Sequence, residues 1–221
     1  MKTLQTKKLN NKLPPEKRSL ESLERSLRIR HKLNPYKYYI PNGKCEEFIR
    51  MVGEGKTFVS LFSAANGVGK TAAGVNILAH ILWGKDSNNK YFNYPLYKRW
   101  PFPKRGRIIS DPTTLTQTLI PEIKKWFPKG RYGIQKKGKM YDYEWVTDTG
   151  FKFDIMSLEQ EPKEFESATL GFAWFDEPPS YSIFKATVAR MRKGGIIFIT
   201  ATPLAGSAWM YDHIICYSGK D

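Results

Sequence analysis

Cysteine is scarce in this chain of 221 residues, which holds only Cys45 and Cys216. The two lie far apart without a pairing pattern, which argues against a disulfide-stapled secreted domain and indicates a reducing compartment. Long apolar runs are also missing. The longest one (75–83) is interrupted by Asn76 and His80, whereas a membrane span needs about 18–20 apolar residues. The basic N-terminus lacks the apolar core of a signal peptide. We therefore expect an intracellular protein without membrane association.

Acidic residues are few relative to basic ones, 21 against 36, and the formal charge is +15. Such an excess favours an anionic partner, nucleic acid above all, over a merely solubilising surface. Residues 1–37 hold eleven of the basic residues and three glutamates. After Pro15, leucines 20, 23 and 27 share one face of an expected helix, which Asn34-Pro35 ends. We interpret 1–35 as a basic tail and an amphipathic helix that docks on the body or on a neighbouring subunit; an ordinary solvated helix is the alternative.

A loop rich in small residues follows an expected strand. The run Ser63-Ala-Ala-Asn-Gly-Val-Gly-Lys-Thr71 lies between an alternating apolar segment (57–62) and a helical pattern that ends at Trp83. Strand, loop and helix N-terminus in this order form a phosphate cradle, since backbone N–H groups and the helix dipole face the anion. The run matches the P-loop pattern G-x-x-x-x-G-K-[ST] except at Ala64, a mild departure if that residue needs no positive φ.

The loop chemistry predicts a nucleoside triphosphate bound with magnesium. Lys70 can reach the β- and γ-phosphates, and the Thr71 hydroxyl can hold Mg²⁺. A glycine-rich turn formed by chance is the alternative. The expected nucleotide-binding residues of the loop and first helical turn are Ala65, Asn66, Gly67, Val68, Gly69, Lys70, Thr71 and Ala72.

Apolar runs alternate with helical patterns along the remainder of residues 36–221. Residues 107–110, 170–175 and 195–200 are expected strands, and 44–52, 113–127 and 181–192 are expected helices. Residues 129–157 alternate with a period of two around an Asp148-Thr-Gly150 turn, which predicts a hairpin. The fold class is therefore α/β: a P-loop NTPase (RecA-like) domain with a mainly parallel sheet flanked by helices, a β-hairpin insertion and a basic N-terminal helical extension.

An acidic pair follows the apolar run 170–175. Asp176 and Glu177 come where a parallel strand ends, at the same edge of the sheet as the P-loop. Asp176 can support Mg²⁺, and Glu177 can orient and deprotonate an attacking water. A helix-capping acidic pair is the alternative. The next strand ends in Thr200-Ala-Thr-Pro203, whose hydroxyls can sense the γ-phosphate; alone, this is an ordinary strand end.

These motifs in this order resemble the N-terminal ATPase domain of phage terminase large subunits, over about residues 36–215. Three segments carry the resemblance: Trp174-Phe-Asp-Glu-Pro-Pro179, Thr202-Pro-Leu-Ala-Gly-Ser-Ala-Trp209 and Tyr38-Tyr-Ile-Pro-Asn-Gly-Lys44. Superfamily 2 helicases share the P-loop, the Asp-Glu strand end and a Ser/Thr-Ala-Thr motif. The resemblance implies an ATP- and Mg²⁺-dependent motor that moves double-stranded DNA into a procapsid, with Thr200 and Thr202 coupling hydrolysis to movement.

The resemblance also implies further site residues. Tyr39 and Asn42 belong to the adenine-binding entry, although Cys45 stands where relatives often have glutamine. An arginine often precedes the acidic strand and acts on a neighbour's ATP, but here that stretch, 165–169, has none. We name Arg190 as the expected catalytic arginine. The other candidates are Arg192, Arg131, Arg105 and Arg107.

Partners implied by the resemblance are double-stranded DNA, a portal protein and a small terminase subunit. The chain is expected to form a ring on the procapsid in the host cytoplasm, or to stay a monomer in isolation. The sequence given leaves no room for the C-terminal nuclease domain that the resemblance implies, so we expect nuclease activity only in a longer parent protein. Basic regions available for DNA are the N-terminal tail, Lys98-Arg99 with Lys104-Arg-Gly-Arg107, and Lys136-Lys-Gly-Lys139.

Two other functions remain open. One is the motor domain of a superfamily 2 helicase or translocase. The other is a nucleotide-responsive DNA-binding assembly subunit with little hydrolysis, for which the altered P-loop start and the missing arginine leave room.

Overall fold

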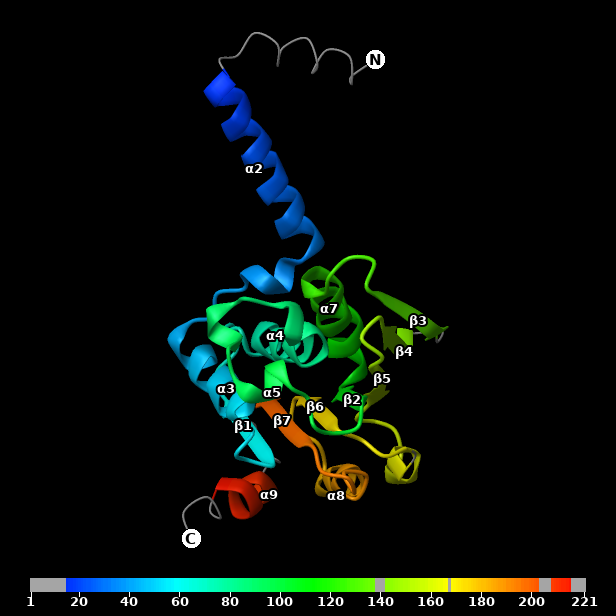
Figure 1. The fold of residues 1–221 in the computed structure, drawn as a ribbon. Coiled ribbons are helices and arrows are strands. Elements are labelled where there is room, and N and C mark those ends of the chain that lie inside the picture. The colour runs from blue at the N-terminus through cyan, green and yellow to red at the C-terminus, as the bar shows by residue number, and fades with distance from the viewer. Residues whose placement is uncertain (1–14, 138–141, 167, 203–207, 216–221) are drawn as a thin grey trace.

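The computed structural model describes residues 15–137, 142–166, 168–202 and 208–215. The tail residues 1–14, the motif residues 203–207, Lys139 and Cys216 lie outside this part of the chain. One seven-stranded sheet forms the centre (Figure 1). Its strands, in spatial order, are β1 (Val59–Ser63), β7 (Ile196–Ala201), β6 (Phe172–Asp176), β2 (Arg105–Ser110), β5 (Lys152–Ser157), β4 (Asp142–Thr147) and β3 (Tyr132–Lys137).

The first five strands of this order are parallel to one another. Strand β4 pairs antiparallel with β5, and β3 pairs antiparallel with β4. The predicted mainly parallel α/β fold is therefore confirmed. The hairpin predicted around the 148–150 turn is also present, as β4 and β5. Because β5 pairs with β2, the hairpin extends the main sheet instead of forming a separate insertion.

Alternate residues of the buried strands face two different hydrophobic clusters, as the two-residue period of a strand requires. Trp174 and Phe198 face the cluster that includes α3 (Gly43–Glu54) and α4 (Lys70–Trp83). Their neighbours Phe175 and Ile199 face the cluster that includes α8 (Tyr181–Val188). Both faces of the sheet are thus covered by helices, as Figure 1 shows.

The predicted helix 113–127 is present but is not uniform. It consists of α6 (Pro112–Thr114), a π-helical turn (Leu115–Leu119) and α7 (Ile120–Trp126). The remaining short elements are η1 (Pro35–Tyr38), η2 (Gly84–Asp86), η3 (Lys90–Phe92), α5 (Pro95–Lys98), η5 (Pro162–Glu166), α9 (Ala208–Met210) and a π-helical turn Tyr211–Ile215.

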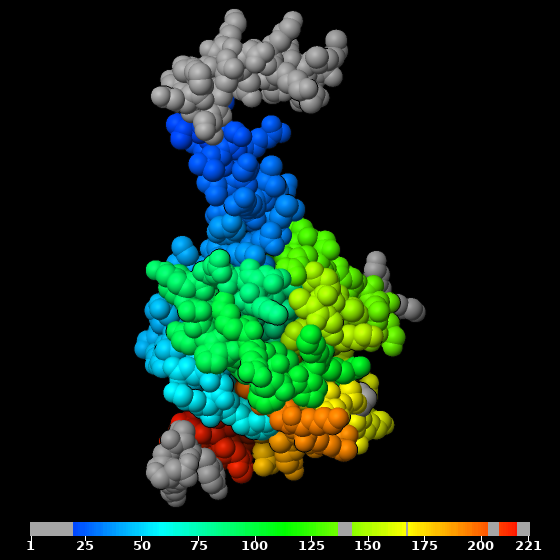
Figure 2. Space-filling view, viewed as in Figure 1, coloured from blue at the N-terminus to red at the C-terminus, as the bar shows by residue number. Residues whose placement is uncertain are grey.

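Helix α2 (Pro15–Leu33) stands away from the rest of the molecule (Figures 1 and 2). Leu20, Leu23 and Leu27 are 60%, 58% and 44% exposed. The expectation that this face docks on the body of the same chain is therefore wrong, and docking on a neighbouring subunit stays a prediction. Among the residues that the structure describes, no helix combines the length and apolarity that crossing a membrane requires.

Candidate nucleotide-binding site

The loop between β1 and α4 has the conformation of a phosphate cradle. Gly67 and Gly69 take φ values of +81° and +89°, which glycine adopts without steric cost. Ala64 instead continues the strand, because its N–H donates to the Ala201 carbonyl. Alanine is therefore tolerated at the position where the motif usually has glycine.

Lys70 lies folded over this loop. Its side chain is largely buried, and its ammonium group donates to the carbonyl oxygens of Ala64 at 2.7 Å and Ala65 at 2.9 Å. These contacts keep the positive charge above the cradle. A bound phosphate would compete with both carbonyls for the same ammonium group.

The end of β6 brings the acidic pair to the loop. The Thr71 hydroxyl donates to the Asp176 carboxylate, at 3.3 Å from Oδ1 and 3.1 Å from Oδ2. The Thr200 hydroxyl donates to Asp176 Oδ1 at 2.6 Å from β7. Burial raises the pKa of the Asp176 carboxyl to about 6. The hydrogen bonds from Thr200 and Thr71 act in the opposite direction and lower this pKa, but burial is the larger effect. Three segments that are distant in the sequence thus converge on one carboxylate.

Trp174 and Ser110 support Asp176 from inside the sheet. The indole N–H of Trp174 donates to the Thr200 hydroxyl oxygen at 2.9 Å, which leaves the Thr200 proton directed at Asp176. The Ser110 hydroxyl, at the end of β2, donates to the Asp176 carbonyl. Gly74 of α4 makes room for the indole, since a Cβ there would lie 2.3 Å from Trp174 Cζ2.

Glu177 has a strained backbone. Its φ is +97°, a region that costs a non-glycine residue about 1–3 kcal/mol. The Thr202 N–H donates to Glu177 Oε2 at 3.1 Å, and the Thr202 hydroxyl lies 3.1 Å from Glu177 Oε1 and 2.9 Å from Asn66 Oδ1. The carboxylate is therefore directed at the P-loop edge and linked to Asn66 of the loop.

The residues expected at the adenine entry serve mainly to support the loop. Asn42 caps α3 by accepting from the Cys45 N–H, and its amide donates to the Val68 carbonyl at 2.9 Å. The Cys45 thiol is buried beside the same carbonyl. Tyr39 is buried, with its ring edge-on to Trp126 at 5.1 Å, so the structure gives it no exposed face on which adenine could stack.

The structure does not bring the expected arginine to this edge of the sheet. Arg190 lies near the opposite end of β6, because its carbonyl accepts from the Leu170 N–H, and its guanidinium donates to the Glu166 carbonyl. Arg192, on the same turn, is exposed and donates to the Ala189 carbonyl. A role of Arg190 in its own chain's site is therefore not supported; a role toward a neighbour's site stays a prediction.

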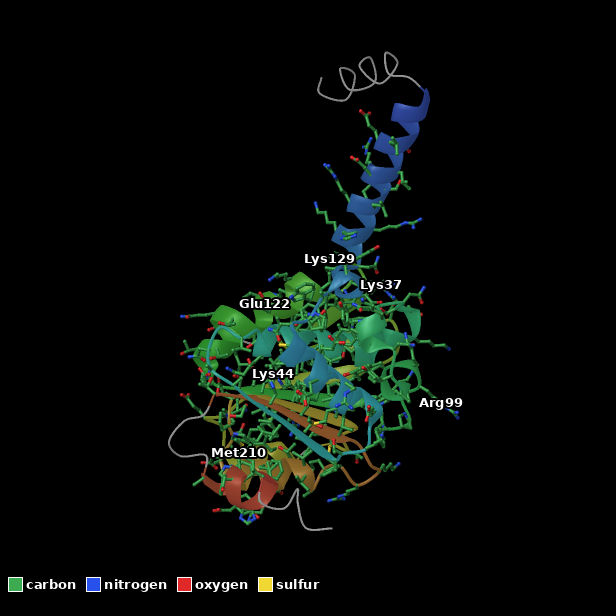
Figure 3. All side chains as sticks on the ribbon, turned by 90° about the vertical axis from the view of Figure 1, so that its left-hand side faces the viewer. Lys37, Lys44, Arg99, Glu122, Lys129 and Met210 are labelled. Carbon is green, nitrogen blue, oxygen red and sulfur yellow. The ribbon has the colours of Figure 1, made fainter. Side chains whose placement is uncertain are left out.

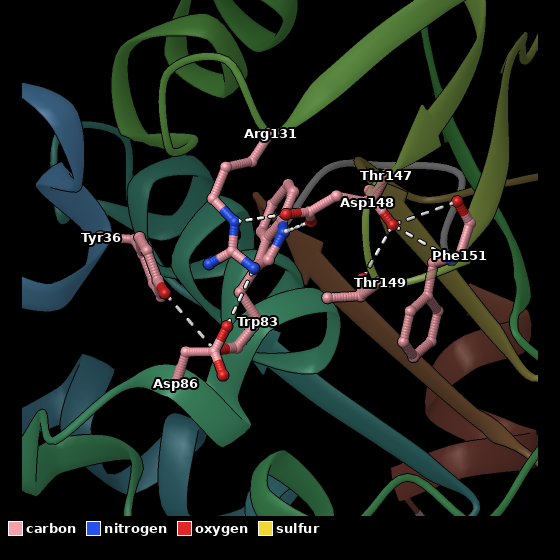
Figure 4. Close-up of polar contacts among 8 residues, drawn as sticks. All are labelled: Tyr36, Trp83, Asp86, Arg131, Thr147, Asp148, Thr149 and Phe151. Atoms are coloured by element: carbon pink, nitrogen blue, oxygen red, sulfur yellow. Dashed lines mark hydrogen bonds and ion pairs between the residues drawn. The ribbon is translucent and has the colours of Figure 1, made fainter.

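The remaining arginine candidates lie beside carboxylates, and two of them are held by close ion pairs. Arg107 is fully buried, and its guanidinium makes two hydrogen bonds to Asp154, at 2.7 and 3.0 Å. Arg105 lies 3.9 Å from the same carboxylate. Arg131 bridges Asp148 and Asp86 at 2.6 and 2.9 Å (Figure 4). Arg107 is neither free to reach another subunit nor available to DNA.

The oxygen donors at the site fit magnesium. One hydroxyl and one carboxylate, from Thr71 and Asp176, face each other at the loop, and Mg²⁺ is usually held by one or two carboxylates together with substrate phosphates. Within the described ranges, no group of three or more His, Cys, Asp or Glu side chains could hold a metal ion alone. The site therefore has the donors of a metal–phosphate site.

Fold and site together define a P-loop α/β domain. Two solved structures of the large terminase from a thermophilic bacteriophage resemble the chain. One has a TM-score of 0.59 at 13% sequence identity, and the other, in complex with ADP, has 0.58 at 14%. Each match covers 80% of this chain, which spans 43% and 42% of the terminase chains. The predicted resemblance to the terminase ATPase domain is thus confirmed at the level of the fold.

Searches at the level of sequence give no match, either to a family model or to a curated protein.

Proposed function

We propose that this chain is the ATPase motor domain of a viral terminase large subunit, which hydrolyses ATP to move double-stranded DNA into a procapsid. The observation that carries the proposal is the hydrogen bond between Thr71 and Asp176. It joins the P-loop to the acidic strand end across 105 residues of sequence. The terminase structures that share the fold support it, and one of them binds ADP.

Each residue of the site has a distinct role in this proposal. The loop N–H groups and Lys70 bind the β- and γ-phosphates, while Thr71 and Asp176 hold magnesium. Bound Mg²⁺ supplies charge neutralisation at the phosphate oxygens. Glu177 orients the attacking water and accepts its proton. Thr202 contacts both Glu177 and Asn66, so it is placed to couple the phosphate state to strand β7.

The whole assembly is part of the proposal. A terminase motor of this kind works as a ring on the procapsid with a portal protein and a small terminase subunit. The strand-displacing motor of a superfamily 2 helicase remains the alternative within the same fold, and DNA unwinding by a longer protein would identify it.

The test measures steady-state ATP hydrolysis by the 221-residue chain in the presence of Mg²⁺, with and without duplex DNA. Lys70→Ala and Glu177→Gln should each reduce kcat on the order of 10²–10³-fold, the usual cost of losing one group that stabilises or transfers charge. Lys185→Ala, a change of an exposed lysine on α8, is the control and should leave the rate unchanged.

Three outcomes separate the possible functions. Loss in both variants supports the assigned site. Equal rates in all variants would refute it. Tight ATP binding without hydrolysis, unaffected by Glu177→Gln, would instead favour the nucleotide-responsive assembly subunit.

A further inference from the structure

A cavity lies at the opposite edge of the sheet from the P-loop. It has a volume of about 580 Å³ and lies between the end of α4, the segment 97–100, the start of β2 and the turn between β4 and β5. Helix α4 runs from Lys70 at the P-loop to Trp83 beside the cavity, and its 14 residues rise about 20 Å. The cavity is thus separate from the nucleotide site.

Four basic side chains line this cavity, and none of the described residues that line it is acidic. The basic residues are Lys85, Lys98, Arg99 and Lys104. The Lys98 ammonium donates to the carbonyls of Gly84 and Ser87, and the Lys104 ammonium donates to the Thr149 carbonyl. Main-chain carbonyls hold these two ammonium groups in place without neutralising them. Lys85 and Arg99 are exposed, and Arg99 extends outward from the molecule (Figure 3).

The nearest carboxylates in the sequence share one arginine. Asp86 follows Lys85, and Asp148 precedes Thr149 on the turn (Figure 4). Both carboxylates are ion-paired with Arg131. Lys85 and Arg99 make no ion pair within 4.0 Å in the part of the chain that is described. The two carboxylates and Arg131 together carry a net charge of −1, so the four basic side chains of the cavity remain in excess, which focuses the field and attracts an anion.

Packed aromatic rings form part of the cavity wall. Trp100 is half-buried, with ring centroids 5.3 Å from Phe102 and 6.0 Å from Phe151, and its indole N–H donates to the Pro103 carbonyl. Tyr97 and Phe151 are buried. Of the aromatic rings that line the cavity, those of Tyr97 and Phe151 thus pack into the body and that of Trp100 is only partly exposed, which limits stacking on bases. Lys98 and Lys104, whose ammonium groups are held by main-chain carbonyls, bind an anion at a lower ordering cost than mobile surface lysines do.

We propose that this cavity binds phosphates of the backbone of duplex DNA. Lysine and arginine side chains are the usual contacts to backbone phosphates and carry no sequence preference. Duplex DNA is favoured over a single strand because single strands gain much of their affinity from stacking on exposed aromatic rings. This inference deepens the proposed translocation function by naming the DNA contact, but its test needs no ATP, so either proposal can fail alone.

The test is the salt dependence of binding of a fluorescent duplex, followed by anisotropy without nucleotide. Lys85→Ser combined with Arg99→Ser should reduce the slope of log K against log [salt] by about 2, and the affinity at ~0.1 M salt by about tenfold or more. Lys125→Ser combined with Lys163→Ser removes the same charge from exposed lysines elsewhere and is the control. Both pairs are exposed, so thermal melting should match that of the unsubstituted chain.

The outcomes decide the proposal. A reduced slope in the first pair alone supports it. An unchanged slope, or equal losses in both pairs, would overturn it, because net charge and not the cavity would then govern binding. A single strand that binds more tightly than the duplex, and loses more in the first pair, would also overturn it in favour of stacking.

Discussion

Trp174→Phe removes the indole N–H that donates to the Thr200 hydroxyl oxygen. The phenyl ring keeps the aromatic stacking on Phe198, whose centroid lies 5.6 Å away. Without the indole N–H, the Thr200 proton is free to turn from Asp176 toward the Phe175 carbonyl, 3.4 Å from the hydroxyl oxygen. Asp176 would then lose its shortest hydrogen bond for part of the time.

The expected size follows from the Trp174–Thr200 hydrogen bond that the substitution removes, in which both partners are neutral. A neutral hydrogen bond contributes about 0.5–1.5 kcal/mol, and each 1.36 kcal/mol is tenfold in rate, so kcat/KM should fall about 2- to 10-fold. The Mg²⁺ concentration for half-maximal rate should rise, because the carboxylate that holds magnesium is less well positioned. The smaller ring also leaves a void in a fully buried site, which should cost about 1–3 kcal/mol of unfolding free energy.

The assay compares ATP hydrolysis over a Mg²⁺ titration for Trp174→Phe and Trp145→Phe. Trp145 is also fully buried, on β4, with its ring stacked on Phe153 at 5.7 Å, so this control reproduces the packing loss away from the acidic centre. Denaturant unfolding of both variants shows that each is folded under the assay conditions. If the Mg²⁺ dependence of the two variants is the same, Trp174 acts through packing alone and the inferred link to Asp176 is wrong.

Gly74→Ala should displace the Trp174 indole and lower the unfolding free energy in urea by about 1–3 kcal/mol, despite the better helix propensity of alanine. The control is Gly133→Ala, because a Cβ there meets nothing within 4 Å. It should change the unfolding free energy by less than about 1 kcal/mol. His80 gives a pH dependence, because burial lowers its pKa from 6.5 to about 3. At His80 the unfolded chain then binds more protons than the folded chain below pH 6.5, so the stability that neutral His80 contributes is complete above that pH and falls by about 1.4 kcal/mol per unit as pH drops toward 3. His80→Gln should flatten the stability curve between about pH 6.5 and 5, and an unchanged slope would show that other groups govern it.

Local patterns in the sequence predicted the elements and their order. The apolar run before Asp176 and the small-residue loop before Lys70 each specify their own backbone conformation, because pleat periodicity and glycine φ preferences act over a few residues. The parallel sheet followed from the alternation of strands and helices. The hairpin was also found from its turn, but its pairing with β2 was not, since register between distant strands depends on packing.

Supporting residues gave weaker signals. In the sequence, Trp174 is indistinguishable from the other apolar residues of a buried strand. Only the position of Thr200 on the neighbouring strand gives the Trp174 indole N–H a functional acceptor. Gly74, in the middle of an apolar helix, was the one local anomaly that could have indicated close packing there. For Arg107 the sequence signal was misleading. In the sequence this residue belongs to a basic cluster available for DNA, whereas in the fold Asp154 neutralises it.

The sequence by itself therefore determined the chemistry present: a phosphate-binding loop, an acidic strand end, hydroxyls on the next strand and a large positive charge. The tertiary structure decided which of these groups meet. It gathers Thr71, Asp176 and Thr200 at one edge of the sheet because parallel strands end together there. It leaves the arginine candidates away from that edge and collects an excess of basic side chains at the other, because ion pairing depends on distance in space and not along the chain.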